Sequence, residues 1–204
     1  MQQAMVQALS PVLHAADQIR SAFLEYMNER GHTDIPRAPL IPKDDPTTLF
    51  TGSGMQPLLP YLLGADHPEG TRLADSQTCL RAQDIEEVGD SRHTTFFEML
   101  GCWSLGDYFK DVQIRQFWTF LTEKVGLEPD RIYVSCFIGD PAHGIPQDTE
   151  SAGIWTELFT AAGVSAGQVE VGSEENGSQH GTGGARIAFY GKKNWWCRGG
   201  TADE

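Results

Sequence analysis

The spacing of apolar residues predicts several helices along the chain. Residues 1–18 carry an interrupted helical pattern, so we treat them as an N-terminal extension. From Asp17 onward the pattern is regular, Asp17 can cap the start of the helix and Gly31 can end it. Further helices are expected over 107–125, which has the longest apolar stripe, and over 150–162.

Runs rich in β-branched and aromatic residues predict strands between these helices. Residues 76–81 and 94–105 are joined by the polar, acidic stretch 83–92, which predicts an antiparallel hairpin with a long tip. Further strands are expected at 132–138, 168–171 and 186–190. The six prolines of segment 32–60 favour extended chain and turns. The length of 204 residues fits one domain, or one domain with a small appendage.

The charge balance argues against a free-standing nucleic-acid binder. The chain has 15 Lys and Arg against 28 Asp and Glu, a net charge of −13. A nucleic-acid binder normally needs a basic face to displace phosphate counterions. Residues 132–185 contain neither Lys nor Arg, so we expect no phosphate to bind there. A small pocket with locally placed arginines is compatible with this composition.

The four cysteines are scattered and form no C-x-x-C pair. This spacing argues against a structural zinc site or a disulfide framework, so we expect no metal site and a cytoplasmic protein. No apolar run approaches the roughly 18 residues of a membrane span. The first residues also lack the basic and apolar regions of a secretory signal. We therefore expect no membrane partner.

The predicted hairpin carries residue types that suit a nucleotide. Arg81 ends its first strand, Arg92 and His93 open the second, and Phe96 and Phe97 follow. An Arg side chain is planar, permanently charged and able to bind two phosphate oxygens, and a Phe ring offers a face on which a base stacks. Each residue alone has a simpler explanation. A strand-end Arg is usually a solvated charge, paired Phe residues usually divide between core and surface, and a single His is usually structural.

Four blocks of sequence resemble the alanyl-tRNA synthetases, and their order and spacing agree with that family. In chain order the blocks are 45–55 (DPTTLFTGSGM), 77–81 (QTCLR), 84–89 (DIEEVG) and 92–110 (RHTTFFEMLGCWSLGDYFK). The last block looks like motif 2 of the family and the helix that follows it. The resemblance runs from about Ile19 to Trp196 and is highly specific.

The resemblance implies the fold and the reaction. The fold would be α/β of the α+β type, a class II synthetase core with an antiparallel sheet flanked by helices. Residues 19–204 would form a partial catalytic domain of this class. The enzyme would be an alanine–tRNA ligase, which uses ATP and Mg²⁺ to activate L-alanine to alanyl-adenylate and then transfers the alanine to tRNA(Ala).

The resemblance also assigns roles to residues of this chain. It implies that Arg81 holds the ATP α-phosphate and that Phe97 stacks on adenine. Arg92 and His93 would line the triphosphate or the loop that closes on it, and act with Arg81 in catalysis. Asp84 and Met99 complete the implied ATP site. The segment 194–196 is similar to the family's N-[FW]-W, which places Asn194 and Trp196 at the alanine pocket.

Several departures from the family pattern put full activity in doubt. The family's amino-group Asp and its motif 3 would lie beyond Glu204. We therefore expect a domain truncated before motif 3, with weak or incomplete activity and self-association through an open sheet edge. The loop from Arg81 to Asp84 lacks the family's phosphate-binding Lys, and Cys102 stands where the family usually has Asn. The alternative is a catalytically silent synthetase-like module that binds ATP or a protein partner.

Overall fold

The computed structural model describes residues 15–43, 48–90 and 93–195. These residues fall into two compact units, the first ending at Phe109 and the second beginning at Lys110. The described part of the chain contains no helix with both the length and the apolar character needed to cross a membrane.

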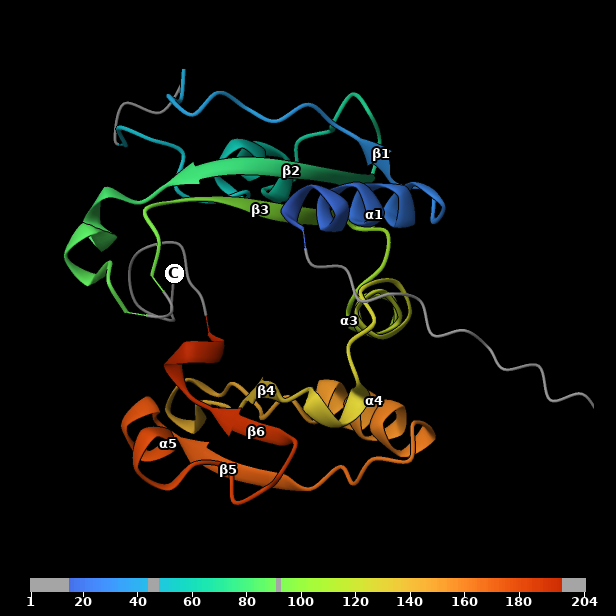
Figure 1. Ribbon diagram of the computed structural model, residues 1–204, viewed down its shortest axis with the longest axis vertical. Helices are drawn as coiled ribbons and strands as arrows, with labels where there is room; N and C mark the ends of the chain where they lie inside the picture. The colour runs from blue at the N-terminus through green and yellow to red at the C-terminus, as the bar shows by residue number, and fades with distance from the viewer. Residues whose placement is uncertain (1–14, 44–47, 91–92, 196–204) are drawn as a thin grey trace, which may run out of the picture. The chain divides into compact units, whose positions relative to one another are not determined.

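The first unit is built on a three-stranded sheet with a helix against it (Figure 1). The sheet has the order β1–β2–β3, in which β1 is parallel to β2 and β2 is antiparallel to β3. Its elements are α1 (Ala16–Asn28), β1 (Thr33–Asp34), the 3₁₀ helix η1 (Gln56–Leu58), α2 (Leu59–Leu62), β2 (Arg72–Leu80), the 3₁₀ helix η2 (Ala82–Glu87) and β3 (Phe96–Ser104). The predicted hairpin is confirmed as β2 and β3, although β2 begins four residues earlier than expected, at Arg72 rather than Ser76.

Helix α1 begins one residue before the expected start, and its first turn differs from the prediction. Ala15 is the N-cap, and its backbone N–H donates to Oε1 of Gln18 at 3.4 Å. Asp17 therefore lies in the first turn and does not cap the helix, which corrects its expected role. There its negative charge still interacts favourably with the helix dipole. Gly31 follows the helix with a φ of +80°, a conformation that favours glycine.

The two faces of the hairpin pack against different parts of the first unit. On one face Glu98 forms a two-point ion pair with Arg20 of α1. On the other face Leu73 packs with Ile35 and Leu58 in a small apolar core. Because side chains alternate along a strand, Arg81, Phe97 and Met99 belong to the face opposite α1.

The second unit is built on a fully parallel sheet of order β4–β6–β5 (Figure 1). Its elements are α3 (Lys110–Thr119), the π-helix η3 (Phe120–Lys124), the 3₁₀ helix η4 (Pro129–Arg131), β4 (Val134–Phe137), the 3₁₀ helix η5 (Pro141–His143), α4 (Thr149–Ala161), β5 (Gln168–Gly172), α5 (Glu174–His180), β6 (Ile187–Tyr190) and the 3₁₀ helix η6 (Lys192–Asn194). Its buried core consists of Ile132, Cys136, Ala152, Trp155, Phe159, Ile187 and Phe189. The three strands and the helix expected over 150–162 are therefore confirmed.

The apolar residues predicted to form one helical stripe over 107–125 have different surroundings in the structure. The helix begins at Lys110, so Tyr108 belongs to the first unit. Trp118 packs against the core of the second unit, whereas Val112 and Phe117 are exposed to solvent. Helix α5 was not expected, because its residues are polar and lie in a glycine-rich region.

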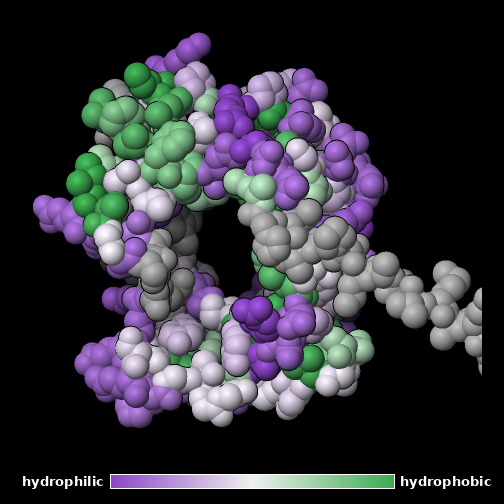
Figure 2. Space-filling view, in the orientation of Figure 1, coloured by the Kyte–Doolittle hydropathy of each residue, from purple (hydrophilic) through white to green (hydrophobic). Residues whose placement is uncertain are grey.

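Apolar side chains also gather on the surface of the first unit. Figure 2 shows them at the upper left of the view, over the loops that lead toward β2. Exposed apolar residues of the described part of these loops are Ile41, Leu49 and Leu63.

Candidate functional site

Arg81 lies at the end of β2 with one end of its guanidinium fixed. Its backbone N–H donates to the carbonyl of Thr95 at 2.8 Å, which holds the residue in the hairpin. Its Nε donates to the carbonyl oxygen of Gly52 at 3.0 Å. The two terminal nitrogens have no hydrogen-bond or ion-pair partner among the residues that the structure describes. The half-buried side chain therefore presents open donors that suit an anion.

Phe97 lies beside this guanidinium. It stands opposite Cys79 in the β2–β3 register, one position along the same face from Arg81. The Cζ atom of Arg81 is 5.1 Å from the centre of the Phe97 ring, within the range of a cation–π contact. Phe97 is half-buried, whereas Phe96 on the other face is 56% exposed. The hairpin thus places a cation and a flat apolar surface side by side.

The loop before η1 joins this arrangement from a distant part of the sequence. Gly52 accepts the bond from Arg81, and the backbone N–H of Gly54 donates to Sδ of Met99 at 3.2 Å. A side chain at Gly54 would crowd Met99 and Trp103, with a Cβ only 3.3 Å from the indole of Trp103. Three of the four predicted sequence blocks therefore meet at one end of the first sheet, around Gly52, Arg81 and Met99.

His93 is bound to carboxylates at the tip of the hairpin. Its Nδ1 lies 2.7 Å from Oδ2 of Asp90, and its Nε2 lies 2.9 Å from Oε2 of Glu87. Both ring nitrogens of His93 therefore lie within hydrogen-bond distance of a carboxylate oxygen. The backbone N–H of His93 also donates to Asp90 at 2.7 Å. His93 therefore orders the tip through acidic neighbours.

The remaining predicted site residues are described only in part. Arg92 and Trp196 lie outside the described residues, and only the backbone of Asp84, in η2, is described. Asn194, in the second unit, donates from Nδ2 to the carbonyl and the hydroxyl of Ser135 at 3.1 and 3.0 Å. Its amide therefore attaches η6 to β4.

Sequence reasoning missed Asp75, a buried carboxylate on the same face of β2 as Arg81. Asp75 is 3% exposed, and its Oδ1 accepts a hydrogen bond from Nε1 of Trp103 at 3.0 Å. Burial raises the pKa of the Asp75 carboxyl. A Cβ on Gly101, opposite Asp75, would collide with this carboxylate and with the indole of Trp103. The glycine that ends the FFEMLG run was the signal that could have revealed this close approach.

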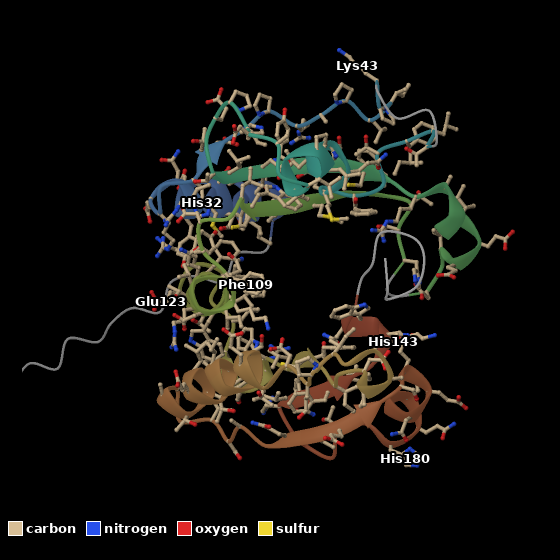
Figure 3. The ribbon with its side chains drawn as sticks, turned by 180° about the vertical axis from the view of Figure 1, so that it is seen from behind. His32, Lys43, Phe109, Glu123, His143 and His180 are labelled. Carbon is tan, nitrogen blue, oxygen red and sulfur yellow. The ribbon has the colours of Figure 1, made fainter. Side chains whose placement is uncertain are left out.

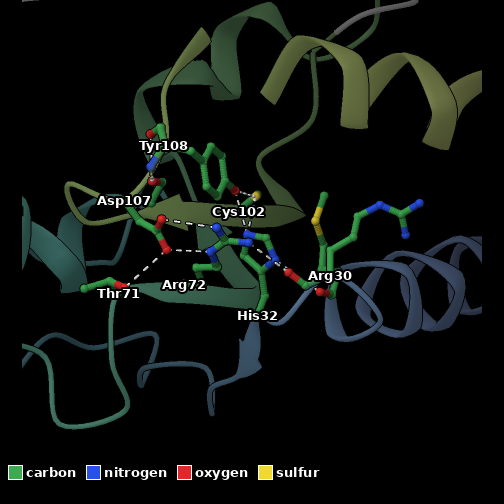
Figure 4. A network of polar contacts seen from close by, with 9 residues as sticks. Arg30, His32, Thr71, Arg72, Cys102, Asp107 and Tyr108 are labelled. Carbon is green, nitrogen blue, oxygen red and sulfur yellow. Dashed lines mark hydrogen bonds and ion pairs between the residues drawn. The ribbon is translucent and has the colours of Figure 1, made fainter. Parts of the chain in front are cut away.

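On the α1 face, Cys102 belongs to a network of polar contacts (Figure 4). Nδ1 of His32 lies 3.1 Å from the carbonyl of Met27 and so donates to it, which leaves Nε2 to accept from the hydroxyl of Tyr108 at 2.6 Å. Sγ of Cys102 is 3.2 Å from that hydroxyl. Burial lowers the pKa of His32 and raises the pKa of Tyr108, so both are neutral. The Cys102 thiol thus takes part in a structural network on the face opposite Arg81.

The labelled histidines occupy separate places in the two units (Figure 3). His32 is buried in the first unit, whereas His143 and His180 belong to the second. Across the described ranges, no three His, Cys, Asp or Glu side chains gather in a way that could hold a metal ion.

Comparison with known proteins identifies the family. The sequence profile described as "tRNA synthetases class II (A)" matches residues 18–195. The chain belongs to this family of class II tRNA synthetases. The predicted fold class is thereby confirmed.

Relatives named alanine–tRNA ligase are identical to this chain at about half of the aligned positions. The alanine–tRNA ligase of Treponema pallidum is 52% identical over 148 residues, which are 72% of this chain and 24% of that protein. The alanine–tRNA ligase of Rubrobacter xylanophilus is 48% identical over 141 residues, 69% of this chain and 16% of that protein. The chain therefore spans a quarter or less of the length of these class II synthetases. The predicted resemblance to alanyl-tRNA synthetases is confirmed.

Proposed function

We propose that this chain is the nucleotide-binding part of the catalytic domain of an alanine–tRNA ligase. The reaction is the ATP-dependent activation of L-alanine to alanyl-adenylate, followed in the whole enzyme by transfer to tRNA(Ala). The names of relatives about 50% identical support this reaction. Transfer to tRNA would need parts of those longer proteins that this chain does not span.

The open end of the Arg81 guanidinium carries the proposal. Its Nε is tied to Gly52, the Phe97 ring lies beside it, and its terminal nitrogens are available to a ligand. An α-phosphate bound to those nitrogens would bring the adenine ring within reach of Phe97. Stacking on an aromatic side chain contributes roughly 1–3 kcal/mol per base in related settings. Met99 would then line the site from the next position on the same face.

The proposed chemistry is electrostatic. The alanine carboxylate attacks the α-phosphorus in line, and pyrophosphate leaves with the electron pair of the broken bond. Negative charge gathers on the phosphoryl oxygens in the transition state, and Arg81 stabilises it because its position is already set. Mg²⁺, when bound, would neutralise part of the phosphate charge. The described residues offer no metal cage, so the nucleotide itself would carry the ion.

The other proposed residues have less direct roles. The two carboxylate contacts of His93 support a role in ordering the hairpin tip rather than in proton transfer. The contacts of Asn194 with Ser135 support a role in holding η6, the segment that precedes Trp196. We propose that Arg92 and Asp84 bind ATP at the hairpin tip. We also propose that Trp196 forms a wall of the alanine pocket.

Alanine-dependent ATP–pyrophosphate exchange tests the proposal, with serine and glycine as control substrates. We expect Arg81→Ala to reduce exchange on the order of a hundredfold to a thousandfold, by analogy with the loss of one donor to a developing oxyanion. Arg115→Ala is the matched control, since Arg115 pairs with Asp111 and Glu157 on the surface of the second unit. It should leave exchange unchanged.

The outcomes of this assay separate the two candidate functions. Exchange that persists in Arg81→Ala would contradict the proposed site. ATP binding that requires Arg81, measured by calorimetry, in the absence of any exchange would instead support the catalytically silent, ATP-binding module.

A further inference from the structure

The Arg81 guanidinium is oriented by a hydrogen bond to one carbonyl and by its contact with the Phe97 ring. An Arg side chain has several rotatable bonds and loses conformational entropy when it is held in one position, so an anion site built on it needs an anchor. Within the described ranges, the Gly52 carbonyl is the one hydrogen-bond acceptor for this guanidinium. The direction of the open nitrogens therefore follows from the placement of Gly52.

Gly52 has no side-chain packing of its own. No heavy atom lies within 4 Å of the place where its Cβ would be. Instead, the peptide that joins Thr51 to Gly52 is held from both sides. Its carbonyl accepts from the N–H of Leu80 at 2.9 Å, and its N–H donates to Oε1 of Gln56 at 3.0 Å. The carbonyl side of this peptide belongs to Thr51, which is only 1% exposed, and Gln56 holds the N–H side.

The side-chain amide of Gln56 is itself oriented. Its Nε2 donates to Oγ1 of Thr48 at 2.6 Å, which turns Oε1 toward the N–H of Gly52. The backbone N–H of Gln56 also donates to the carbonyl of Ser53 at 3.4 Å. Both ends of the amide are thus used to close the loop whose carbonyl holds Arg81.

From this geometry we infer that Gln56 is a positioning residue for Arg81. It holds the N–H of Gly52, the carbonyl of the same residue accepts from Nε of Arg81, and the terminal nitrogens then point where an α-phosphate can bind. The ligand in this inference rests on the proposed function, but the control of Arg81 by Gln56 does not. Its side chain bonds to Gly52 and Thr48 of the same loop, so we expect its effect on the proposed site to pass through Arg81.

The first test needs no ligand. Exchange of the Arg81 Nε proton with water is followed by ¹⁵N NMR, and the signal is assigned by its loss in Arg81→Lys. We expect Gln56→Met, which keeps length and removes both amide bonds, to speed this exchange on the order of tenfold. Gln56→Glu keeps an oxygen acceptor for Gly52 and should stay near wild type. Gln179→Met is the control, because within the described ranges the side chain of Gln179 has one hydrogen bond, to the surface residue Glu175 at 3.3 Å.

Thr48→Val provides a second variant, in case Gln56→Met disturbs folding. It removes the acceptor that orients the amide and should speed exchange by a smaller factor. Wild-type exchange in a folded Gln56→Met variant, or in Thr48→Val if Gln56→Met does not fold, would overturn the inference. An equal increase in Gln179→Met would overturn it as well.

A double-mutant cycle on ATP affinity separates this inference from the proposed function. We expect Gln56→Met to weaken ATP binding in the wild-type background and to have no further effect in Arg81→Ala. Additive losses would show that Gln56 acts independently, against the inference. If Arg81→Ala leaves ATP affinity unchanged, the proposed nucleotide site is wrong, and the NMR result alone decides the role of Gln56.

Discussion

At the scale of single residues, a glycine in the β2–β3 hairpin leaves space for the buried carboxylate of Asp75. Gly101 lies opposite Asp75 on the face that carries Arg81, and the Asp75 carboxylate and the Trp103 indole meet above it. Burial of a carboxylate is unfavourable unless hydrogen bonds compensate it. The indole N–H supplies one such bond, so any side chain at position 101 disturbs both partners.

Gly101→Ala should therefore destabilise the protein. Its Cβ would displace the Asp75 carboxylate from Trp103, and overpacking of this kind typically costs about 1–3 kcal/mol. The denaturant midpoint measures the loss. Gly153→Ala is the matched control, since Gly153 lies exposed within α4 with no atom within 4 Å of its Cβ position. It should be neutral or stabilising by about 0.5–1 kcal/mol, and a similar loss in both variants would contradict this account.

At the scale of elements, an ion pair between Arg20 and Glu98 links α1 to β3 on one face of the sheet. Nε and the terminal nitrogen of Arg20 reach the two carboxylate oxygens of Glu98 at 2.6 and 2.9 Å, and Ser76 donates to the same carboxylate at 3.1 Å. The Arg20 hydrogen bonds hold the pKa of Glu98 below its usual range. This carboxylate therefore favours the folded state only while it is ionised.

The stability of the folded state should consequently fall in acid. Because the pKa of Glu98 is lower in the folded than in the unfolded chain, its stabilising contribution is complete above the unfolded value of about 4.3 and is lost as pH falls through the lowered value. Glu98→Gln should flatten the pH dependence of unfolding in that acidic range. Chemical unfolding at a series of pH values from 5 downward measures it. An unchanged acid slope in the variant would argue against this role for Glu98.

The elements also show how far sequence reasoning reaches. The β2–β3 hairpin and α4 could be predicted because their apolar periodicity and turn residues are local signals. The parallel order of β4, β6 and β5 could not, because it depends on contacts between segments far apart in the chain. Helix α5 was missed because a polar helix with a Ser173 N-cap gives little periodicity.

For the candidate site, the motif residues Arg81, Phe97 and Met99 could be found from their resemblance to the family. Gln56 and Asp75 could not be found in this way, since their roles depend on which backbone groups the fold brings within reach of their side chains. The contacts of His93 with Glu87 and Asp90 likewise depend on how the hairpin tip folds, so the sequence alone could not predict them.

At the scale of the whole molecule, each of the two units has an apolar core of its own among the described residues. The first centres on Leu73 with Ile35 and Leu58, and the second contains Phe159 and Ile187. A unit with its own core can open without the other. The net charge of −13 is spread over a chain whose proposed ligand is also an anion. We therefore expect binding of the proposed ligand to depend on a local cation such as Arg81.

Phe159→Ala should loosen the second unit selectively. Phe159 is fully buried, and removing a buried Phe side chain typically costs about 3–5 kcal/mol. Native-state hydrogen exchange should show faster exchange for the amides of β6, while those of β2 keep their protection. Equal loss of protection in both strands would show that the two units unfold as one.

The π-helix η3 marks a turn at which we expect the chain to tolerate the loss of one residue. Within an α-helix, the loss of one codon rotates every later residue by about 100° relative to the earlier ones. Here the N–H of Val125 already bonds to the carbonyl of Phe120, five residues back, at 2.9 Å, so one residue is accommodated as a bulge. A single-codon deletion within 120–124 would restore a regular helical turn and keep Trp118 and Phe159 in contact. Single-residue gaps in alignments of this family should therefore collect at this turn rather than within α3.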